Sequence, residues 1–99
     1  MVASPPQQTP PQTILVLDDE RPILNLISSF LESQALACIT TTDPGEALEI
    51  LDRQPIDLVI SDIHMDGMTG VEFLERARVT DPDTLVILMT GQPTVDTAV

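Results

Sequence analysis

The chain has 99 residues, of which 42% are hydrophobic and 20% are charged, so it can form one small globular domain. Its net charge of −12 and its aromatic content of 2% exclude two classes of function. A duplex-binding protein needs a basic track along the phosphates, and a single-strand binder needs stacking aromatic side chains. The single cysteine, Cys38, excludes an internal disulfide and favours a reducing compartment, so we expect a cytoplasmic protein.

Residues 1–12 are expected to form a disordered, proline-rich leader, and residues 13–99 the globular part. The leader has almost no large apolar side chains and lacks the basic and apolar regions of a secretory signal. No stretch of the sequence approaches the roughly 20 apolar residues of a membrane helix. We therefore expect no contact with a membrane.

The first half of the globular part predicts a strand, a helix and a second strand. Thr13–Leu17 is a continuous apolar run, as in a strand that is covered on both faces. Pro22 suits the first turn of a helix, which then runs to about Ser33 with apolar side chains at three- and four-residue spacing. The inward residues of this helix are expected to be Ile23, Leu24, Ile27, Phe30 and Leu31. Ala37–Thr41 is a short strand in which Cys38 is expected to be buried.

The segment that follows predicts a second, capped helix. Asp43 offers an N-cap, with Pro44 in the first turn and Glu46 at the third helical position. The face of this helix that we expect to be buried holds Ala47, Leu48 and Leu51.

Two more strands and a third helix complete the pattern. Ile56–Ser61 is the third strand and Thr84–Met89 the fourth. The helix between them opens at Thr69 or Gly70. Its inward residues are expected to be Val71, Phe73, Leu74 and Ala77. Thr94–Val99 indicates the first turn or two of another helix.

This alternation of strands and helices predicts an α/β fold with a doubly wound parallel sheet. Ligands bind such sheets at the carboxyl ends of the strands. Asp18 and Asp19 follow the first strand, Asp62 follows the third, and Thr90 and Gly91 follow the fourth. Crowded carboxylates repel one another unless a cation lies among them, and hard oxygen ligands suit Mg²⁺. We therefore expect a magnesium site at this edge of the sheet.

These motifs, taken together, resemble the receiver domain of two-component response regulators, a CheY-like, flavodoxin-like fold. The resemblance covers roughly residues 13–99. It rests on three stretches, which are Leu17-Asp18-Asp19-Glu20, then Asp62-Ile63-His64-Met65-Asp66-Gly67-Met68-Thr69-Gly70, then Met89-Thr90-Gly91. The strand order that it implies is 2-1-3-4 for the four strands present.

The resemblance implies a role for each acidic residue. Asp62 would be the phosphoacceptor, which takes a phosphoryl group from a phosphohistidine of a sensor histidine kinase. Asp18 and Asp19 would bind Mg²⁺ together with Asp62 and the backbone carbonyl of His64. The chain would then be a signalling module and not an enzyme.

The resemblance also assigns the residues around the phosphoryl group. Thr90 would be a switch hydroxyl that hydrogen-bonds the phosphoryl group, with the backbone of Gly91 alongside. His64 and Gln92 would flank the group and tune the lifetime of the acyl phosphate. Asp66 stands where the family usually has Pro, and it adds a negative charge near the site.

Receiver domains continue into a fifth strand, whose end carries a Lys that contacts the phosphoryl group, and a last helix. The sequence stops at Val99 and contains no lysine, so we expect a C-terminally truncated receiver whose parent protein carries an output domain. Without a fifth strand, the apolar segment Leu85–Met89 becomes an edge strand. Such an edge pairs readily with another chain, so we expect self-association through it.

Two other interpretations stay open from the sequence. A pseudo-receiver would keep the fold and serve only in assembly. The complete set of acidic residues disfavours it for the parent protein, although the missing Lys makes it plausible for this chain. A Mg²⁺-dependent phosphohydrolase with an aspartyl nucleophile is the third possibility. Those enzymes typically show Asp-x-Asp after the first strand, and Asp18-Asp19-Glu20 lacks that spacing.

Overall fold

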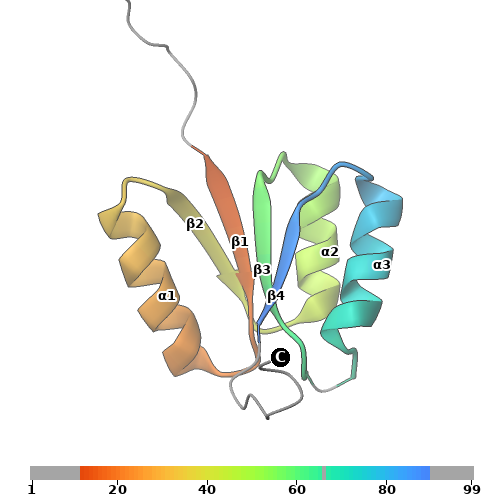
Figure 1. Cartoon of the computed structure of the whole chain (residues 1–99), viewed down its shortest axis with the longest axis horizontal. Helices are drawn as coiled ribbons and strands as arrows, with labels where there is room; N and C mark the ends of the chain where they lie inside the picture. Colours follow the sequence, from red (N-terminus) through yellow and green to blue (C-terminus); the bar gives the residue numbers. More distant parts are fainter. Residues whose placement is uncertain (1–11, 66, 90–99) are drawn as a thin grey trace, which may run out of the picture.

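The structure, a computed structural model, describes residues 12–65 and 67–89, and in them parallel strands alternate with helices (Figure 1). The strands are β1 (Thr13–Leu17), β2 (Ala37–Thr41), β3 (Leu58–Asp62) and β4 (Val86–Met89). The helices are α1 (Arg21–Ser33), α2 (Pro44–Arg53) and α3 (Gly70–Thr80). Almost all of the predicted leader and the whole of the predicted helix at 94–99 lie outside the described residues. None of the three helices in the described part has the length and hydropathy of a membrane span.

The four strands form one parallel sheet in the order β2-β1-β3-β4, so the predicted fold class and strand order are confirmed. Helix α1 covers one face of the sheet, and α2 and α3 cover the other (Figure 1). The chain moves outward from β1 to β2 and then returns across β1 to β3. The winding direction therefore reverses between β1 and β3, which is where doubly wound sheets bind their ligands.

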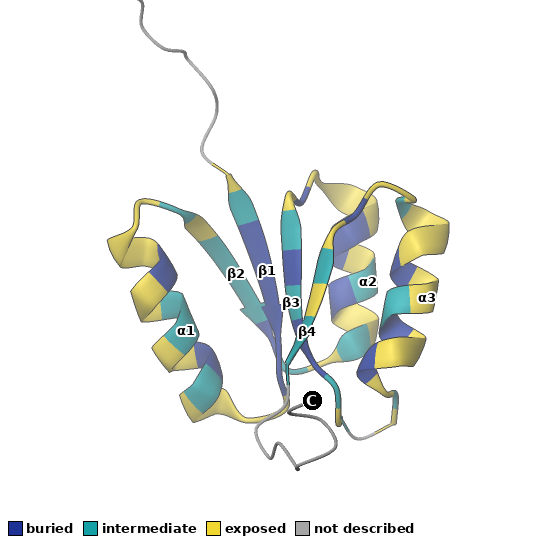
Figure 2. Cartoon of the chain, viewed as in Figure 1, coloured by how far each residue is buried: buried dark blue, intermediate teal, exposed yellow. Residues whose placement is uncertain are grey.

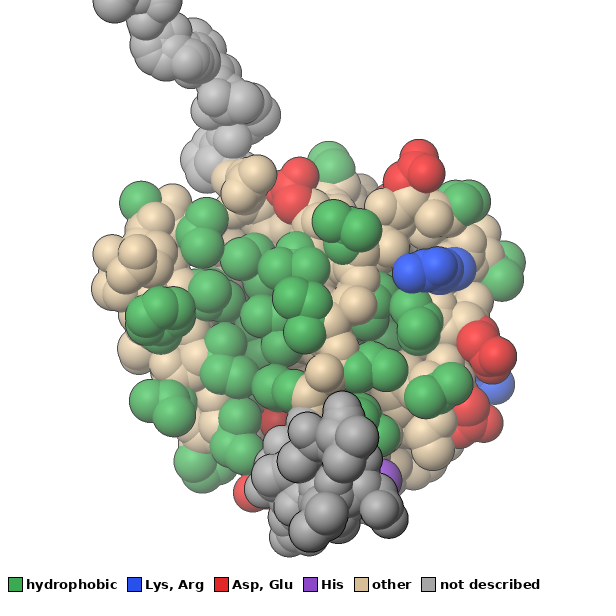
Figure 3. Space-filling model, viewed as in Figure 1, with side chains coloured by type: hydrophobic (Ala, Val, Ile, Leu, Met, Phe, Trp, Pro, Cys, Tyr) green, Lys and Arg blue, Asp and Glu red, His purple; other side chains and the backbone are tan. Residues whose placement is uncertain are grey.

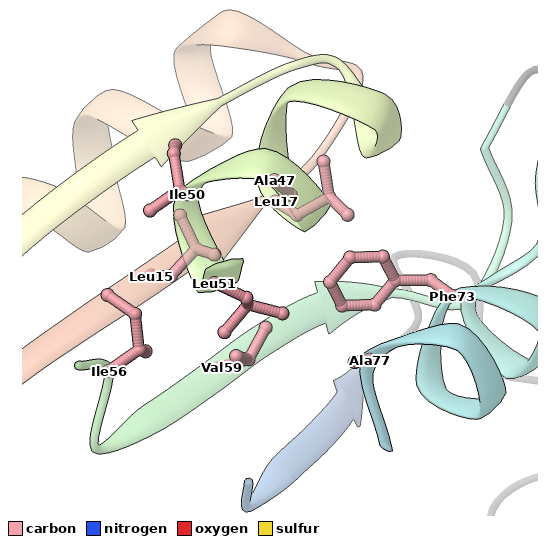
Figure 4. Packing of buried hydrophobic residues seen from close by; sticks show 9 residues of the cluster. All are labelled: Leu15, Leu17, Ala47, Ile50, Leu51, Ile56, Val59, Phe73 and Ala77. Carbon is pink, nitrogen blue, oxygen red and sulfur yellow. The ribbon is translucent and has the colours of Figure 1, made fainter. Parts of the chain in front are cut away.

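Strand β1 supplies side chains to two separate cores, because successive residues of a strand point to opposite faces. Leu15 and Leu17 pack on the side of α2 and α3, where Phe73 is fully buried (Figure 4). Ile14 and Val16 pack on the other side, under α1. These four residues of β1 are buried, whereas much of the outer surface of each helix is exposed (Figure 2).

Two residues that were expected to point inward are exposed instead. Phe30 of α1 is 62% exposed and Val71 of α3 is 50% exposed. Neighbouring residues of a helix lie about 100° apart around its axis. Because Leu31 and Phe73 occupy the buried sides of the two helices, Phe30 and Val71 are turned away from the sheet. The other expected inward residues are buried or half-buried, and Cys38 of β2 is half-buried where burial was expected.

The last two strands begin later than predicted. Strand β3 starts at Leu58, and β4 starts at Val86. The ladder between them begins at the pair Val59 and Val86, so Ile56 and Thr84 precede the paired residues. The apolar run in each segment therefore extends beyond the hydrogen-bonded ladder.

Capping residues fix where α2 and α3 begin. The Asp43 carboxylate accepts the N–H of Gly45 at 3.0 Å, which confirms the predicted N-cap. At α3, the Thr69 hydroxyl accepts the N–H of Glu72 at 3.1 Å, and the Glu72 carboxylate accepts the N–H of Thr69 at 2.9 Å. A cap of this kind stabilises a helix by about 1 kcal/mol. It also fixes the C-terminal end of the loop that begins at Asp62.

Candidate functional site

The carboxyl ends of β1 and β3 lie side by side, since Leu17 is in register with Ser61. The next residue in each strand direction is an aspartate, Asp18 after β1 and Asp62 at the end of β3. Asp18 is 2% exposed and Asp62 is 9% exposed. The structure therefore brings together two of the carboxylates that the sequence singled out, and it buries both.

Three consecutive acidic residues form a compact group at the same edge. The carboxylates of Asp18, Asp19 and Glu20 each offer an oxygen, and these oxygens lie within 4.8 Å of one another. Asp19 and Glu20 are exposed, so solvent and ions can reach the group. Oxygen donors of this type fit Mg²⁺. The sequence interpretation gave Glu20 no role, although the unbroken run of three acidic residues was a visible signal.

The pKa of the Asp18 carboxyl is raised above its ordinary value. Burial is the largest cause, and a hydrogen bond from the N–H of Glu20 at 2.9 Å partly offsets it. The negative charges of Asp62, Asp19 and Glu20 raise the pKa further. A cation in this group would favour the ionised form of Asp18. The electrostatics of the described residues are therefore suited to holding a divalent ion.

We expect Asp18→Asn to stabilise the metal-free chain at neutral pH. A carboxyl whose pKa is higher in the folded state binds more protons there than in the unfolded state, so stability falls as pH rises through that window. The variant should lose this contribution to the pH dependence of the free energy of unfolding. Urea unfolding in EDTA at several pH values between about 4 and 7 measures it.

Glu49→Gln is the matched control for this prediction, because it removes one exposed carboxylate from α2. It should change the pH slope much less than Asp18→Asn does. Equal slopes in the wild type and in Asp18→Asn would contradict the prediction.

Backbone contacts hold the loop that follows Asp62. The carboxylate of Asp62 accepts the N–H of His64 at 3.2 Å, which orients it. The N–H of Ile63 donates to the carbonyl of Met89 at 2.8 Å, and the N–H of Gly70 donates to the carbonyl of Ile63 at 2.7 Å. The first residues after Asp62 are therefore tied to β4 on one side and to the start of α3 on the other.

Gly70 lies against the backbone of Asp62, a close approach that the sequence interpretation did not predict. A Cβ atom at Gly70 would lie 2.5 Å from the carbonyl oxygen of Asp62 and 2.9 Å from the Cα of Ile63. Real Cβ contacts are not this short, so any side chain would force the helix and the loop apart. The repeated glycines of the 62–70 segment were the signal that could have identified this close approach.

Gly70→Ala should therefore destabilise the fold by about 1–3 kcal/mol, the usual range for overpacking. Gly45→Ala is the control, since a Cβ at Gly45 would meet only the Asp43 side chain, at 3.5 Å, which is ordinary contact. Gly45→Ala lies in the first turn of α2 and should be neutral or stabilising by up to about 1 kcal/mol. Chemical unfolding of both variants measures the difference, and equal stabilities would contradict the prediction.

The remaining predicted site residues divide into two groups. His64 is exposed in the loop after Asp62. Asp66, Thr90, Gly91 and Gln92 lie outside the described residues, so their roles stay predictions.

The family model of the response regulator receiver domain matches residues 14–99 of the chain. The chain belongs to the response regulator receiver domain family. A receiver domain is the phosphoacceptor module of a two-component system, and this chain is such a signalling module.

Curated relatives of this receiver domain are regulatory proteins. The chain is 33% identical over 89 residues to the transcriptional regulatory protein GlrR of Escherichia coli K12, which covers 90% of the chain and 20% of the relative. It is 36% identical over 78 residues to the heme response regulator HssR of Staphylococcus aureus MRSA252, which covers 79% of the chain and 34% of the relative. The chain thus spans between a fifth and about a third of the length of these relatives.

Solved receiver structures share the fold. The chemotaxis protein CheY4 of Vibrio cholerae superposes with a TM-score of 0.81 at 26% identity, covering 90% of this chain and 76% of that one. The response regulator TrrA of Thermotoga maritima, solved in complex with Mg²⁺ and BeF, gives a TM-score of 0.77 at 34% identity, covering 82% and 70%. The beryllofluoride-activated NtrC4 receiver domain dimer gives 0.79 at 31% identity, covering 87% and 71%.

Proposed function

We propose that Asp62 of this receiver domain accepts a phosphoryl group from a phosphohistidine of a sensor histidine kinase, with Mg²⁺ bound at the acidic edge. The observation that carries the proposal is the placement of the Asp62 carboxylate beside Asp18 at the winding reversal of the sheet. The related TrrA was solved in complex with Mg²⁺ and BeF, which supports the proposal that this receiver domain also uses a divalent ion for phosphoryl transfer.

The transfer uses one carboxylate oxygen of Asp62 as the nucleophile. It forms a new O–P bond while the N–P bond of the phosphohistidine breaks, and the imidazole nitrogen leaves with the electron pair. The product on this chain is an acyl phosphate. Transfer of this kind has a loose transition state, so it depends on positioning the nucleophile in line. The N–H of His64, bonded to Asp62, restricts the carboxylate before the donor arrives.

The metal would be held by Asp18, Asp19 and Asp62, with the backbone carbonyl of His64 as a further ligand. When bound, Mg²⁺ neutralises charge on the phosphoryl oxygens. Asp18 would be a buried ligand, whereas Asp19 would be a ligand exposed to solvent. Glu20 adds a third negative charge to the group and favours cation entry.

The remaining roles complete the proposal. Thr90 would hydrogen-bond the phosphoryl group and act as the switch, with Gly91 alongside and with His64 and Gln92 flanking the group. We propose that residues 13–99 belong to the receiver domain and that 1–12 form a leader. In the whole protein, a separate output domain would read the switch in the cytoplasm, as the regulatory relatives suggest.

Phosphoramidate tests the proposal without a cognate kinase, because its P–N bond resembles that of phosphohistidine. We expect intact mass spectrometry to show a mass gain of one phosphoryl group in Mg²⁺ and none in EDTA. Binding of Mg²⁺ without any mass gain would contradict phosphotransfer and leave the pseudo-receiver interpretation. Steady turnover of a phosphate monoester would instead indicate a phosphohydrolase.

A further inference from the structure

Ser61, the residue before the proposed phosphoacceptor, is the most deeply buried polar side chain in the described part of the chain. It is 0% exposed and lies in the middle of the sheet, in register with Leu17 of β1 and Leu88 of β4. Alternate residues of a strand share a face, so Ser61 points to the same side as Val59, which packs in the core beneath α2 and α3. A hydroxyl is costly to bury there unless it has a hydrogen-bond partner.

The partner of the Ser61 hydroxyl is the backbone carbonyl of Asp62. The hydroxyl donates to this carbonyl oxygen at 3.0 Å in the buried interior. The same peptide group is also held through its N–H, because Ile63 donates to the carbonyl of Met89 at 2.8 Å. Gly70 packs against the carbonyl so closely that a Cβ atom does not fit between them. The peptide that joins Asp62 to Ile63 is therefore held by three separate contacts.

The orientation of this peptide affects how the Asp62 carboxylate is held. Rotating the peptide changes ψ of Asp62 and φ of Ile63, and it moves the N–H of His64, which the carboxylate accepts at 3.2 Å. The side chain of His64 is exposed at the surface (purple in Figure 3). The buried anchor of the loop therefore lies at its other end, at Ser61.

We infer that Ser61 is a positioning residue for phosphoryl transfer to Asp62. Its hydroxyl acts through the backbone of Asp62 and takes no part in the bond changes at phosphorus. By holding the peptide after Asp62, it keeps the carboxylate oxygen in line with the incoming phosphorus atom. The rate of a loose phosphoryl transfer depends on this alignment. The inference rests on the proposed function and adds to it a residue that sets the rate.

Two substitutions at Ser61 separate positioning from stability. Ser61→Ala removes the hydroxyl and should lower the initial rate of phosphoryl incorporation from phosphoramidate by about tenfold. Ser61→Thr keeps a hydroxyl and adds a methyl group to a packed core. It should hold the rate within about threefold of the wild type while it lowers the midpoint of urea unfolding. A purely structural role would make the rate follow the unfolding midpoint in both variants.

Amide hydrogen exchange of the metal-free chain gives a second readout, which does not depend on phosphoryl transfer. The N–H of Ile63 belongs to the held peptide. The N–H of Val59, near the start of β3, donates to the carbonyl of Leu85 at 2.8 Å and serves as the internal reference. Ser61→Ala should speed exchange at Ile63 by about fivefold relative to Val59. Ser61→Thr should keep this ratio within about twofold of the wild type.

Thr84→Val is the matched control, because it also removes a buried hydroxyl. The Thr84 hydroxyl lies before β4, at the opposite end of the sheet from Asp62, and has no hydrogen-bond partner among the residues that the structure describes. This variant should change neither the rate nor the exchange ratio by more than about twofold.

Ser61→Ala with the rate of the wild type would overturn the inference, and so would Ser61→Thr that is as slow as Ser61→Ala. A slow Ser61→Ala with an unchanged exchange ratio would also overturn it, because the effect would not pass through the peptide after Asp62. A wild-type chain that takes up no phosphoryl group would contradict the proposed function itself, and the positioning role would fall with it.

Discussion

Asp62→Asn is expected to lower Mg²⁺-dependent phosphoryl incorporation by more than about 100-fold. An amide oxygen is a much weaker nucleophile than a carboxylate oxygen, so the variant loses the group that forms the O–P bond. Asp62 is buried and accepts the N–H of His64 at 3.2 Å, and the amide oxygen of the isosteric variant can accept the same N–H, so the loop should be preserved. Mass spectrometry after treatment with phosphoramidate measures the loss.

Asp57→Asn is the control for this prediction, because Asp57 lies just before β3, at the opposite end of the strand from Asp62. Its carboxylate accepts the N–H of Thr13 at 2.8 Å, and the amide oxygen of the variant can still accept it, so the variant should lose at most about 1 kcal/mol of stability and keep its phosphoryl incorporation. Incorporation that persists in Asp62→Asn, or that disappears in Asp57→Asn, would place the phosphoacceptor elsewhere.

Phe73→Ala should destabilise the fold by about 3–5 kcal/mol, the largest stability change that we expect from a single truncation. Phe73 is the largest fully buried side chain in the described part of the chain. It lies in the core between the sheet and the α2–α3 layer (Figure 4). Removing its ring leaves a cavity that backbone shifts fill only in part. Because small domains have only about 5–15 kcal/mol of stability in total, the variant should lose a large fraction of its free energy of unfolding.

Phe30→Ala makes the same chemical change at an exposed position of α1. Because the Phe30 side chain is 62% exposed, this variant should alter the free energy of unfolding by about 0.5 kcal/mol or less. Urea unfolding of the two variants measures the contrast. A small effect of Phe73→Ala would mean that the core is not packed as described.

The sequence predicted most of the fold because the apolar pattern changes period at each element. Strands β1 and β2 have the predicted bounds, and α1 ends at the predicted Ser33. The position of Phe30 was not predictable in this way. Whether an apolar residue at the margin of a helical stripe faces the sheet depends on how the helix is rotated, and that rotation is set by tertiary packing of Leu24 and Leu31. The starts of β3 and β4 depend similarly on which residues find hydrogen-bond partners across the ladder.

The location of the site was predictable from the sequence. The burial of its individual residues and the contacts between them were less so. Placing Asp18 and Asp62 at one edge needed only the rule that parallel strands present their carboxyl ends together. The sequence does not reveal that Asp18 is buried while its neighbour Asp19 is exposed, because that contrast arises from the turn after β1. Nor does it show the close approach of Gly70 to Asp62, which arises from the three-dimensional course of the loop.

Paramagnetic broadening by Mn²⁺ in place of Mg²⁺ tests most directly whether the aspartates at positions 18, 19 and 62 surround one divalent cation. In ¹⁵N-labelled chain, substoichiometric Mn²⁺ should broaden the amide signals of those residues first. The signals of Asp57 and Thr84, before the first residues of β3 and β4, should stay sharp. Excess Mg²⁺ should restore the broadened signals by competition. Broadening spread evenly over the exposed carboxylates of α2 and α3, with the amide of Asp62 unaffected, would contradict a single metal site at this edge.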